Sequence, residues 1–254
     1  MNRQAQGVVM LLFGGAVLKA SVTDMYLRYV KEVLQPFLIA ASVLLIAAGL
    51  MTLWYDLRAG RGDHAGHGPG DRAGHGHEDA HGHGAGQHRE PRVGWLLILP
   101  VLGLLLVSPP ALGSYTAATA GTSLSDEQRV VDFPPLPQVS LVELTVLDYA
   151  ARAVWDDGES LQGRRVQLTG FIVTDRHGEP FLARLVLTCC AADARPVKVG
   201  LTGDVPDGLP DDTWVTVIGG YVEQTSIDPI NEATIPYLQV ESWREVEPPS
   251  QPYE

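Results

Sequence analysis

The sequence is poor in cysteine and contains no familiar catalytic motif. Its 254 residues include two cysteines, Cys189 and Cys190, and because these are adjacent no disulfide framework is present. No Ser/His/Asp order, phosphate-binding loop or HExxH pattern occurs, so an enzyme is not expected. Basic residues are scarce in residues 113–254, which carry nine Lys/Arg against twenty-two Asp/Glu. An acidic surface repels phosphate backbones, which excludes nucleic acid as an expected partner.

Long uncharged runs, in contrast, are present, and they predict membrane helices. The runs Pro36–Tyr55 and 93–112 each have about the length needed to cross a hydrocarbon core. Gln6–Val22 is shorter in purely apolar sequence, so a signal peptide is the alternative to a first membrane helix. Between Gln6–Val22 and Pro36–Tyr55, the segment Asp24–Gln35 mixes charged residues with aromatic residues at helical spacing, which suits an interfacial segment. We therefore expect two transmembrane helices within residues 1–55, a third at 93–112, and the lipid bilayer as a partner.

Charge asymmetry across these runs predicts the topology. Residues 56–92 form a low-complexity Gly/His/Asp/Arg loop with almost nothing apolar to bury, and we expect this loop to be disordered. The loop is also the most basic one, through Arg58, Arg61, Arg72, Arg89 and Arg92. The positive-inside rule then places 56–92 in the cytoplasm and the C-terminal part outside a bacterial cell membrane.

The C-terminal part is predicted to be a linker followed by a folded domain. Residues 113–138 are rich in Ser, Thr, Ala and Pro and form the expected linker. The domain, 139–247, is expected to open with a helix, because Ser140 and Glu143 have capping-box spacing and an apolar stripe follows as far as Trp155.

Alternating apolar residues then predict a mostly-β domain with one leading helix. A Gly219-Gly220 pair indicates a bulge or sharp bend in the fourth of five strands. Five short strands and one helix favour a small barrel of the oligonucleotide/oligosaccharide-binding (OB) type. The expected strands are Arg165–Thr174, Pro180–Thr188, Pro196–Leu201, Thr213–Glu223 and Pro236–Ser242.

Seven of the eight histidines lie in the loop 56–92, and they form the first candidate metal site. Imidazoles separated by one glycine can reach the same ion, and they suit zinc or another divalent transition metal such as copper or nickel. The alternative is a solvated linker in which the histidines have no role. The candidate ligands are His64, His67, His75, His77, His81, His83 and His88.

The adjacent cysteines form the second candidate site, together with Asp193. In a strand, Cys189 and Cys190 point to opposite faces, so one thiol is expected in the core and the other toward solvent or a partner. Neighbouring residues lie about 3.8 Å apart at Cα, too close for an unstrained disulfide. The functional readings are a thiolate metal ligand, a redox switch or an intermolecular bridge, and the alternative is two small buried hydrophobes. His177 is expected in a surface turn.

Several motifs of the chain resemble the YcgQ-like bacterial family of proposed permease subunits. They are Gly170-Phe171, Thr188-Cys-Cys-Ala-Ala-Asp-Ala194, Trp214-Val-Thr-Val-Ile-Gly219 and the tail Glu247–Tyr253, behind short N-terminal membrane spans. The resemblance implies a separate multi-span permease as partner, a link to divalent metal homeostasis, and functional roles for Cys189, Cys190 and Asp193. The histidine tract is not part of the family pattern.

These observations lead to one hypothesis with two rivals. The first is a non-enzymatic accessory subunit of a membrane permease. The second is a membrane-anchored thiol-redox or metallochaperone protein that uses Cys189 and Cys190. The third is an envelope ligand-binding module in which both cysteines are structural.

Overall fold

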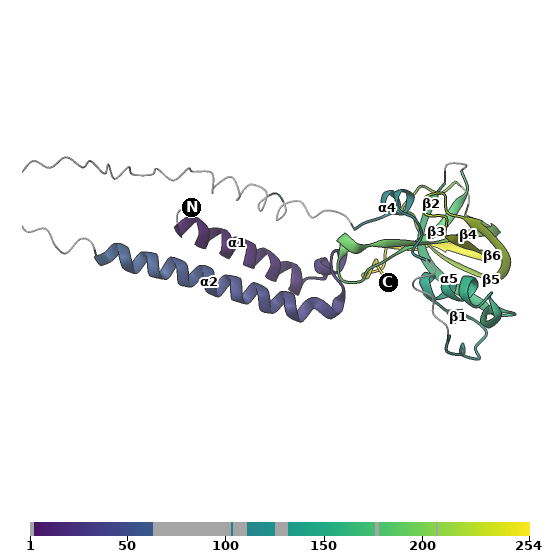
Figure 1. Ribbon diagram of the computed structural model, residues 1–254, viewed down its shortest axis with the longest axis horizontal. Coiled ribbons are helices and arrows are strands. Elements are labelled where there is room, and N and C mark those ends of the chain that lie inside the picture. The colour runs from purple at the N-terminus through teal and green to yellow at the C-terminus, as the bar shows by residue number, and fades with distance from the viewer. Residues whose placement is uncertain (1–2, 63–102, 104–110, 125–131, 176–177, 207) are drawn as a thin grey trace, which may run out of the picture. The chain divides into compact units, whose positions relative to one another are not determined.

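The computed structural model describes residues 3–62, 103, 111–124, 132–175, 178–206 and 208–254 (Figure 1). The chain divides into two compact units. The first contains the two long N-terminal helices. The second contains Asp24–Leu34, which connects those helices, together with the described residues beyond Pro110. The connector is therefore part of the same unit as the β-domain, although more than 70 residues separate them in sequence.

The first unit is a pair of helices, α1 (Arg3–Val22) and α2 (Gln35–Gly62), as the two apolar runs predicted. Glycines let the helices approach closely: a Cβ on Gly49 would lie 3.0 Å from the carbonyl oxygen of Gly7. Gly14 faces Ser42 and its neighbours in the same way, so the helices run antiparallel. Small residues at a helix contact are typical of packing in membranes.

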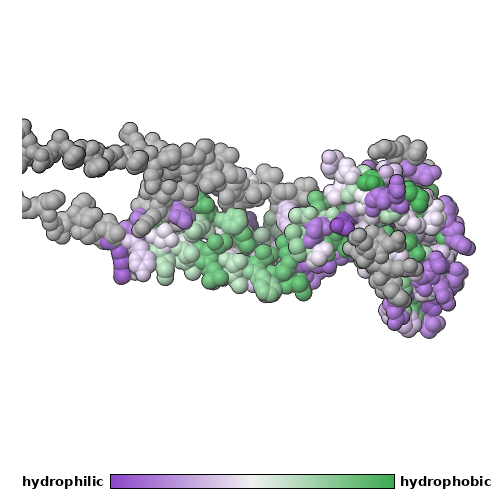
Figure 2. Space-filling model, viewed as in Figure 1, coloured by the Kyte–Doolittle hydropathy of each residue, from purple (hydrophilic) through white to green (hydrophobic). Residues whose placement is uncertain are grey.

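The outer surface of this helix pair is apolar. Figure 2 shows hydrophobic surface along both helices, and large side chains such as Phe37, Leu44 and Trp54 are exposed. The buried hydroxyls of Ser21 and Ser42 donate to carbonyl oxygens of their own helices, at 2.7 Å each. Both helices are long and apolar enough to cross a membrane. The predicted third helix, 93–112, lies outside the described residues apart from its end and Gly103.

The connector, where aromatics at helical spacing suggested an interfacial segment, does not form a continuous α-helix. It forms two short 3-10 helices, η1 (Asp24–Arg28) and η2 (Glu32–Leu34), and Tyr26 is buried. The reason is tertiary, because backbone groups between the two turns pair with a loop of the β-domain rather than with a continued helix.

The second unit is built on a closed barrel of five strands. These are β2 (Arg165–Thr174), β3 (Pro180–Val186), β4 (Arg195–Gly203), β5 (Trp214–Ile227) and β6 (Thr234–Glu245). Their order is β2-β3-β4-β6-β5, and a β2–β5 pairing closes the sheet. The β4–β6 pair is parallel and the other four pairs are antiparallel. All five predicted strands are present, so the mostly-β prediction is confirmed.

Alternating side chains fill the barrel, as the strand pattern predicted. Val166 and Leu168 of β2 and Val215 and Val217 of β5 are fully buried in one apolar cluster. The predicted irregularity is also found, because the register of β5 against β6 shifts between Ile218 and Gly219. A Cβ at Gly219 would lie 2.1 Å from the carbonyl oxygen of Gln239, so only glycine permits this crossing.

The leading helix starts later than predicted, at α5 (Val146–Trp155), and the Ser140–Glu143 capping box is wrong. Val142 and Glu143 instead form a short strand, β1, that pairs in parallel with β2. Because that ladder requires extended backbone, the helix begins only after Thr145, whose hydroxyl accepts the backbone N–H of Asp148. A further 3-10 turn, η5 (Glu159–Leu161), leads into β2.

The described start of the expected linker 113–138 packs against the barrel. A short helix, α4 (Ser114–Thr119), buries Ala117 completely against Phe171. The Ser114 backbone N–H and hydroxyl both donate to Asp212, at 2.6 and 2.7 Å. The polar residues that suggested a solvated tether therefore find partners on the barrel.

Candidate functional site

Cys189 and Cys190 lie in a loop that follows β3, so the prediction that they occupy a strand is wrong. Asp193 explains why the strand stops at Val186. Its carboxylate accepts the backbone N–H groups of Thr188 and Cys189, both at 2.8 Å, and that of Cys190 at 3.4 Å. A carboxylate that binds three successive N–H groups removes the donors that a strand would give to its neighbour.

The same turn gathers three potential metal ligands. Cys190 precedes the 3-10 helix η6 (Ala191–Asp193), and its carbonyl oxygen accepts the backbone N–H of Asp193 at 3.0 Å. As a result the sulfurs of Cys189 and Cys190 and a carboxylate oxygen of Asp193 all lie within 4.8 Å of one another. The structure thus brings together the three residues that the sequence singled out.

Neither thiol is in the core, which corrects the expectation of one buried and one exposed cysteine. Cys189 is exposed and Cys190 is half-buried, and both are free thiols. Strand alternation does not apply to a turn, which leaves both sulfurs on the same side as the carboxylate. The alternative of two small buried hydrophobes is therefore wrong.

The carboxylate and the nearer thiol shift each other's pKa. The hydrogen bond from the Cys189 thiol, helped by the three backbone N–H groups, lowers the pKa of Asp193 to about 2. The hydrogen bond to Asp193, followed by one to Cys190, raises the pKa of Cys189 to about 12. A thiol whose pKa is raised in this way carries its proton at neutral pH.

The connector pairs with the loop of residues 187–194, which we call the cysteine loop. The Ala191 N–H donates to the carbonyl oxygen of Tyr29 at 2.7 Å, and the Lys31 N–H donates to that of Cys189 at 3.2 Å. Val30 and Cys190 form an isolated antiparallel bridge between these two bonds. The ligand-bearing loop is therefore paired, backbone to backbone, with the segment that joins α1 to α2.

The end of the sequence braces the same region. Glu254 pairs through its backbone with Leu185 and Leu187, and its carboxylate accepts the N–H groups of Val146 and Leu147 at 3.0 Å each. Arg184 Nε lies 3.7 Å from that carboxylate. This bracing was not predicted, because neither the tail nor the connector has a periodicity that reveals its partner.

Tyr253 ties three segments together. Its hydroxyl donates to the carbonyl oxygen of Arg28 in the connector and accepts the backbone N–H of Leu112, both at 2.9 Å. Burial is the main cause of a raised pKa at Tyr253, so this hydroxyl keeps its proton for the bond to Arg28. The tail, the connector and the segment at Leu112 thus meet at one side chain.

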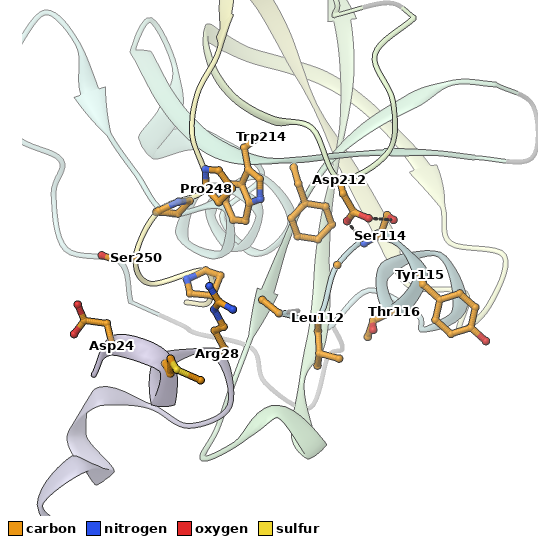
Figure 3. Close-up of a pocket in the computed structure, with 16 residues that line it drawn as sticks. Asp24, Arg28, Leu112, Ser114, Tyr115, Thr116, Asp212, Trp214, Pro248 and Ser250 are labelled. Carbon is orange, nitrogen blue, oxygen red and sulfur yellow. Dashed lines mark hydrogen bonds between the residues drawn. The ribbon is translucent and has the colours of Figure 1, made fainter. Parts of the chain in front are cut away.

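A cleft of about 880 Å³ opens beside this junction (Figure 3). Arg28 of the connector, Trp214 of β5 and Pro248 of the tail line one side, and the bonded pair Ser114 and Asp212 lies on the other. The cleft combines apolar walls with the exposed guanidinium of Arg28 and the exposed carboxylate of Asp24. Its lining residues come from the connector, from Ala111 and Leu112, and from the residues that follow them.

Two family models match the chain: the DUF1980 N-terminal domain over residues 5–123 and the DUF1980 C-terminal domain over residues 144–254. The chain belongs to the DUF1980 family. The match agrees with the YcgQ-like resemblance of the sequence motifs. No curated protein and no solved structure matches the chain.

The DUF1980 boundaries divide the site between both family domains. The connector falls in the N-terminal domain match, and Cys189, Cys190 and Asp193 fall in the C-terminal one. The contact between the connector and the cysteine loop is therefore a contact between the two family domains. The seven candidate ligands of the histidine loop, and His177, lie outside the described residues, so the histidine site stays a prediction.

Proposed function

We propose that this DUF1980 protein is a membrane-anchored accessory subunit of a permease, linked to divalent metal homeostasis. The pairing of the connector with the cysteine loop carries the proposal. It links three residues that could bind a metal ion, Cys189, Cys190 and Asp193, to the segment between two apolar helices. No catalytic role is assigned to any residue. The expected partner is a separate multi-span permease subunit.

The same pairing supports three membrane crossings. If α1 and α2 both span, the connector lies on one side of the membrane and the end of α2 on the other. The barrel contacts the connector, so it lies on the connector's side. The chain must then cross once more between residues 62 and 111, and the apolar run 93–112 supplies that span.

The arginine bias gives the direction of this arrangement. It places the histidine loop 56–92 in the cytoplasm and the barrel outside a bacterial cell membrane. In this topology the histidine loop and the cysteine loop offer metal ligands on opposite sides of the bilayer. That arrangement suits a subunit that handles an ion on its way across.

The barrel supports a binding role rather than a catalytic one. Its strand order, with one parallel pair among antiparallel pairs, favours the OB type of five-stranded Greek-key barrel. Such barrels serve as binding modules, and here the loop that follows β3 carries both cysteines. We take the barrel as the part that contacts the permease or its cargo.

Reporter fusions test the topology. Alkaline phosphatase fused after Glu254 is expected to be active, and the same enzyme fused at Gly84 inactive. A cytoplasmic reporter at the two positions provides the matched control and should give the opposite pattern. An inactive phosphatase at Glu254, with the fusion protein present in membranes, would contradict the arrangement.

Co-purification tests the function. The tagged full chain is extracted from membranes in mild detergent and its partners are identified by mass spectrometry, alongside metal analysis of the same sample. A multi-span permease is expected in the eluate, with zinc or another transition metal above the level of a tagged membrane protein of similar size. Recovery of the chain without any multi-span partner, even after cross-linking, would contradict the proposal.

A further inference from the structure

We infer that Cys189, Cys190 and Asp193 form a three-ligand site for a thiophilic divalent cation, with zinc as the preferred ion and one coordination position left open. The site itself stands on the geometry of the loop. Its role as the place where a permease's cargo is held rests on the proposed function.

The ligand atoms lie near the spacing that zinc requires. Zinc binds thiolate sulfur at about 2.3 Å, so two sulfurs bound in a tetrahedral site lie about 3.8 Å apart. The three ligand atoms already lie within 4.8 Å of one another. Rotation of the exposed and half-buried cysteine side chains supplies the remaining approach, about 1 Å at most.

The carboxylate is oriented in advance, with room for an ion. A carboxylate offers about four acceptor sites, and the N–H groups of Thr188, Cys189 and Cys190 occupy three. The Cys189 thiol hydrogen-bonds the carboxylate as well. An ion between the sulfur and the carboxylate would replace that thiol proton, since a thiol must deprotonate to bind metal.

The loop backbone is rigidly supported. The connector holds it at Cys189 and Ala191, and the Leu187 N–H donates to the carbonyl oxygen of Glu254 at 3.0 Å. Ligands held by a supported backbone keep their geometry before the ion arrives, and this lowers the ordering cost of binding.

The chemistry of the ligands selects the class of ion. Two thiolates favour zinc or softer ions, and they disfavour magnesium and calcium, which prefer oxygen. Among the described residues the cluster has three ligands rather than the four of a closed structural zinc site. The fourth position is open to water or to a ligand from a partner, which suits an ion that is passed on.

Cobalt(II) provides a specific probe, because thiolate–cobalt charge transfer in the near ultraviolet is silent for histidine ligands. The reduced, metal-free full chain in detergent is titrated with cobalt and then with zinc. We expect a charge-transfer band that zinc removes. The band should fall to about half or less in C189S and in C190S, since each variant lacks one of the two cobalt–sulfur bonds, and it should vanish in the C189S/C190S double variant. D193N should bind cobalt about tenfold or more weakly. The matched control, D204N, changes an exposed carboxylate in another loop and should behave as wild type.

A second measurement needs no variant. Alkylation of the two thiols in the wild-type chain should slow when zinc is added, and magnesium should have no effect. Four results would each overturn the site: cobalt binding to the wild-type chain without the band, a band of full strength in either cysteine variant, an unchanged affinity in D193N, or alkylation that zinc does not slow. Thiolate-dependent binding without a co-purified permease would instead overturn the proposed function and leave the site standing.

Discussion

Two aspartate carboxylates of the barrel domain, Asp228 and Asp193, both accept backbone N–H groups, but they differ in whether a positively charged side chain pairs with them. Asp228 is fully buried, and it accepts the N–H groups of Thr122 and Ile230 at 3.0 and 2.9 Å. Lys198 Nζ lies 2.9 Å from the same carboxylate. The chain therefore supplies both the donors and the countercharge, and the result is a closed structural link between the barrel and residues 120–122.

Asp193 accepts three N–H groups, but within the part of the chain that the structure describes no cation pairs with it. Its remaining neighbours are the thiols of Cys189 and Cys190. In both places an aspartate orders a turn by accepting backbone N–H groups. At Asp228 the chain supplies the countercharge, and in the site that we propose at Asp193 a bound cation would supply it.

Glu254 is intermediate between these two. It accepts two N–H groups at the start of α5, and the nearest cation, Arg184, is 3.7 Å away, beyond hydrogen-bond length. The pKa of Glu254 is raised, and burial of its carboxylate is the main cause. We therefore expect the loss of unfolding free energy to be largest for a substitution at Lys198, the partner of Asp228. It should be smaller at Glu254 and smallest at Asp193.

The largest effect is expected from Lys198→Met, which keeps the length of the side chain and removes its charge. The variant leaves Asp228 buried and without a countercharge. Breaking a buried ion pair in this way costs about 3–5 kcal/mol of unfolding free energy. Urea denaturation followed by tryptophan fluorescence measures the loss. Lys198→Arg keeps the charge and should lose less, and a Lys198→Met variant as stable as wild type would show that the pair is not structural.

A smaller effect is expected from Glu254→Ala, which removes the acceptor for Val146 and Leu147. The loss resembles that of a helix cap, about 0.5–2 kcal/mol of unfolding free energy. Glu247→Gln, an exposed glutamate in the same tail, is the matched control and should stay within about 0.5 kcal/mol. Equal urea midpoints for Glu254→Ala and the control would mean that the tail does not brace α5.

Asp193→Asn should affect the cysteine loop rather than the whole domain. An amide replaces one acceptor oxygen with a donor, so the N–H groups of Thr188 and Cys189 cannot both be satisfied as before. Hydrogen exchange of residues 187–194 is expected to accelerate, while exchange in β2 and β5 stays as in wild type. Unchanged exchange in the loop would show that Asp193 does not order it.

The smallest effect is the pH response of the same loop. The pKa of Asp193 is lowered to about 2 from its usual 3.8, so its contribution to loop order is present above the usual value and is lost as pH falls through about 2. The amide resonances of Cys189 and Cys190, followed by NMR from about pH 5 downward, should move with that midpoint. The Asp193→Asn variant lacks the titration, and a midpoint near 3.8 in wild type would contradict the hydrogen-bonded carboxylate.

Local pattern was enough to predict much of this molecule. Two apolar runs predicted α1 and α2, since helix length and apolar composition depend on neighbouring residues alone. Side-chain alternation predicted all five barrel strands, and the Gly219-Gly220 pair predicted the bulge, because each signal is contained within one strand. Cys189, Cys190 and Asp193 were singled out as a group because they lie within five residues of one another.

Only the tertiary structure decided what these residues do together. Asp193 accepts three N–H groups directly after β3, and Cys189 and Cys190 therefore lie in a turn rather than in a strand. Pairing with β2 delayed the start of α5, and pairing with the cysteine loop made the connector part of the barrel domain. The contacts of the connector and of Tyr253 with the barrel join segments more than 100 residues apart, and no local periodicity records them. The physical reason is that a backbone N–H or carbonyl can be satisfied by any partner of the right geometry, and only the folded chain selects which one.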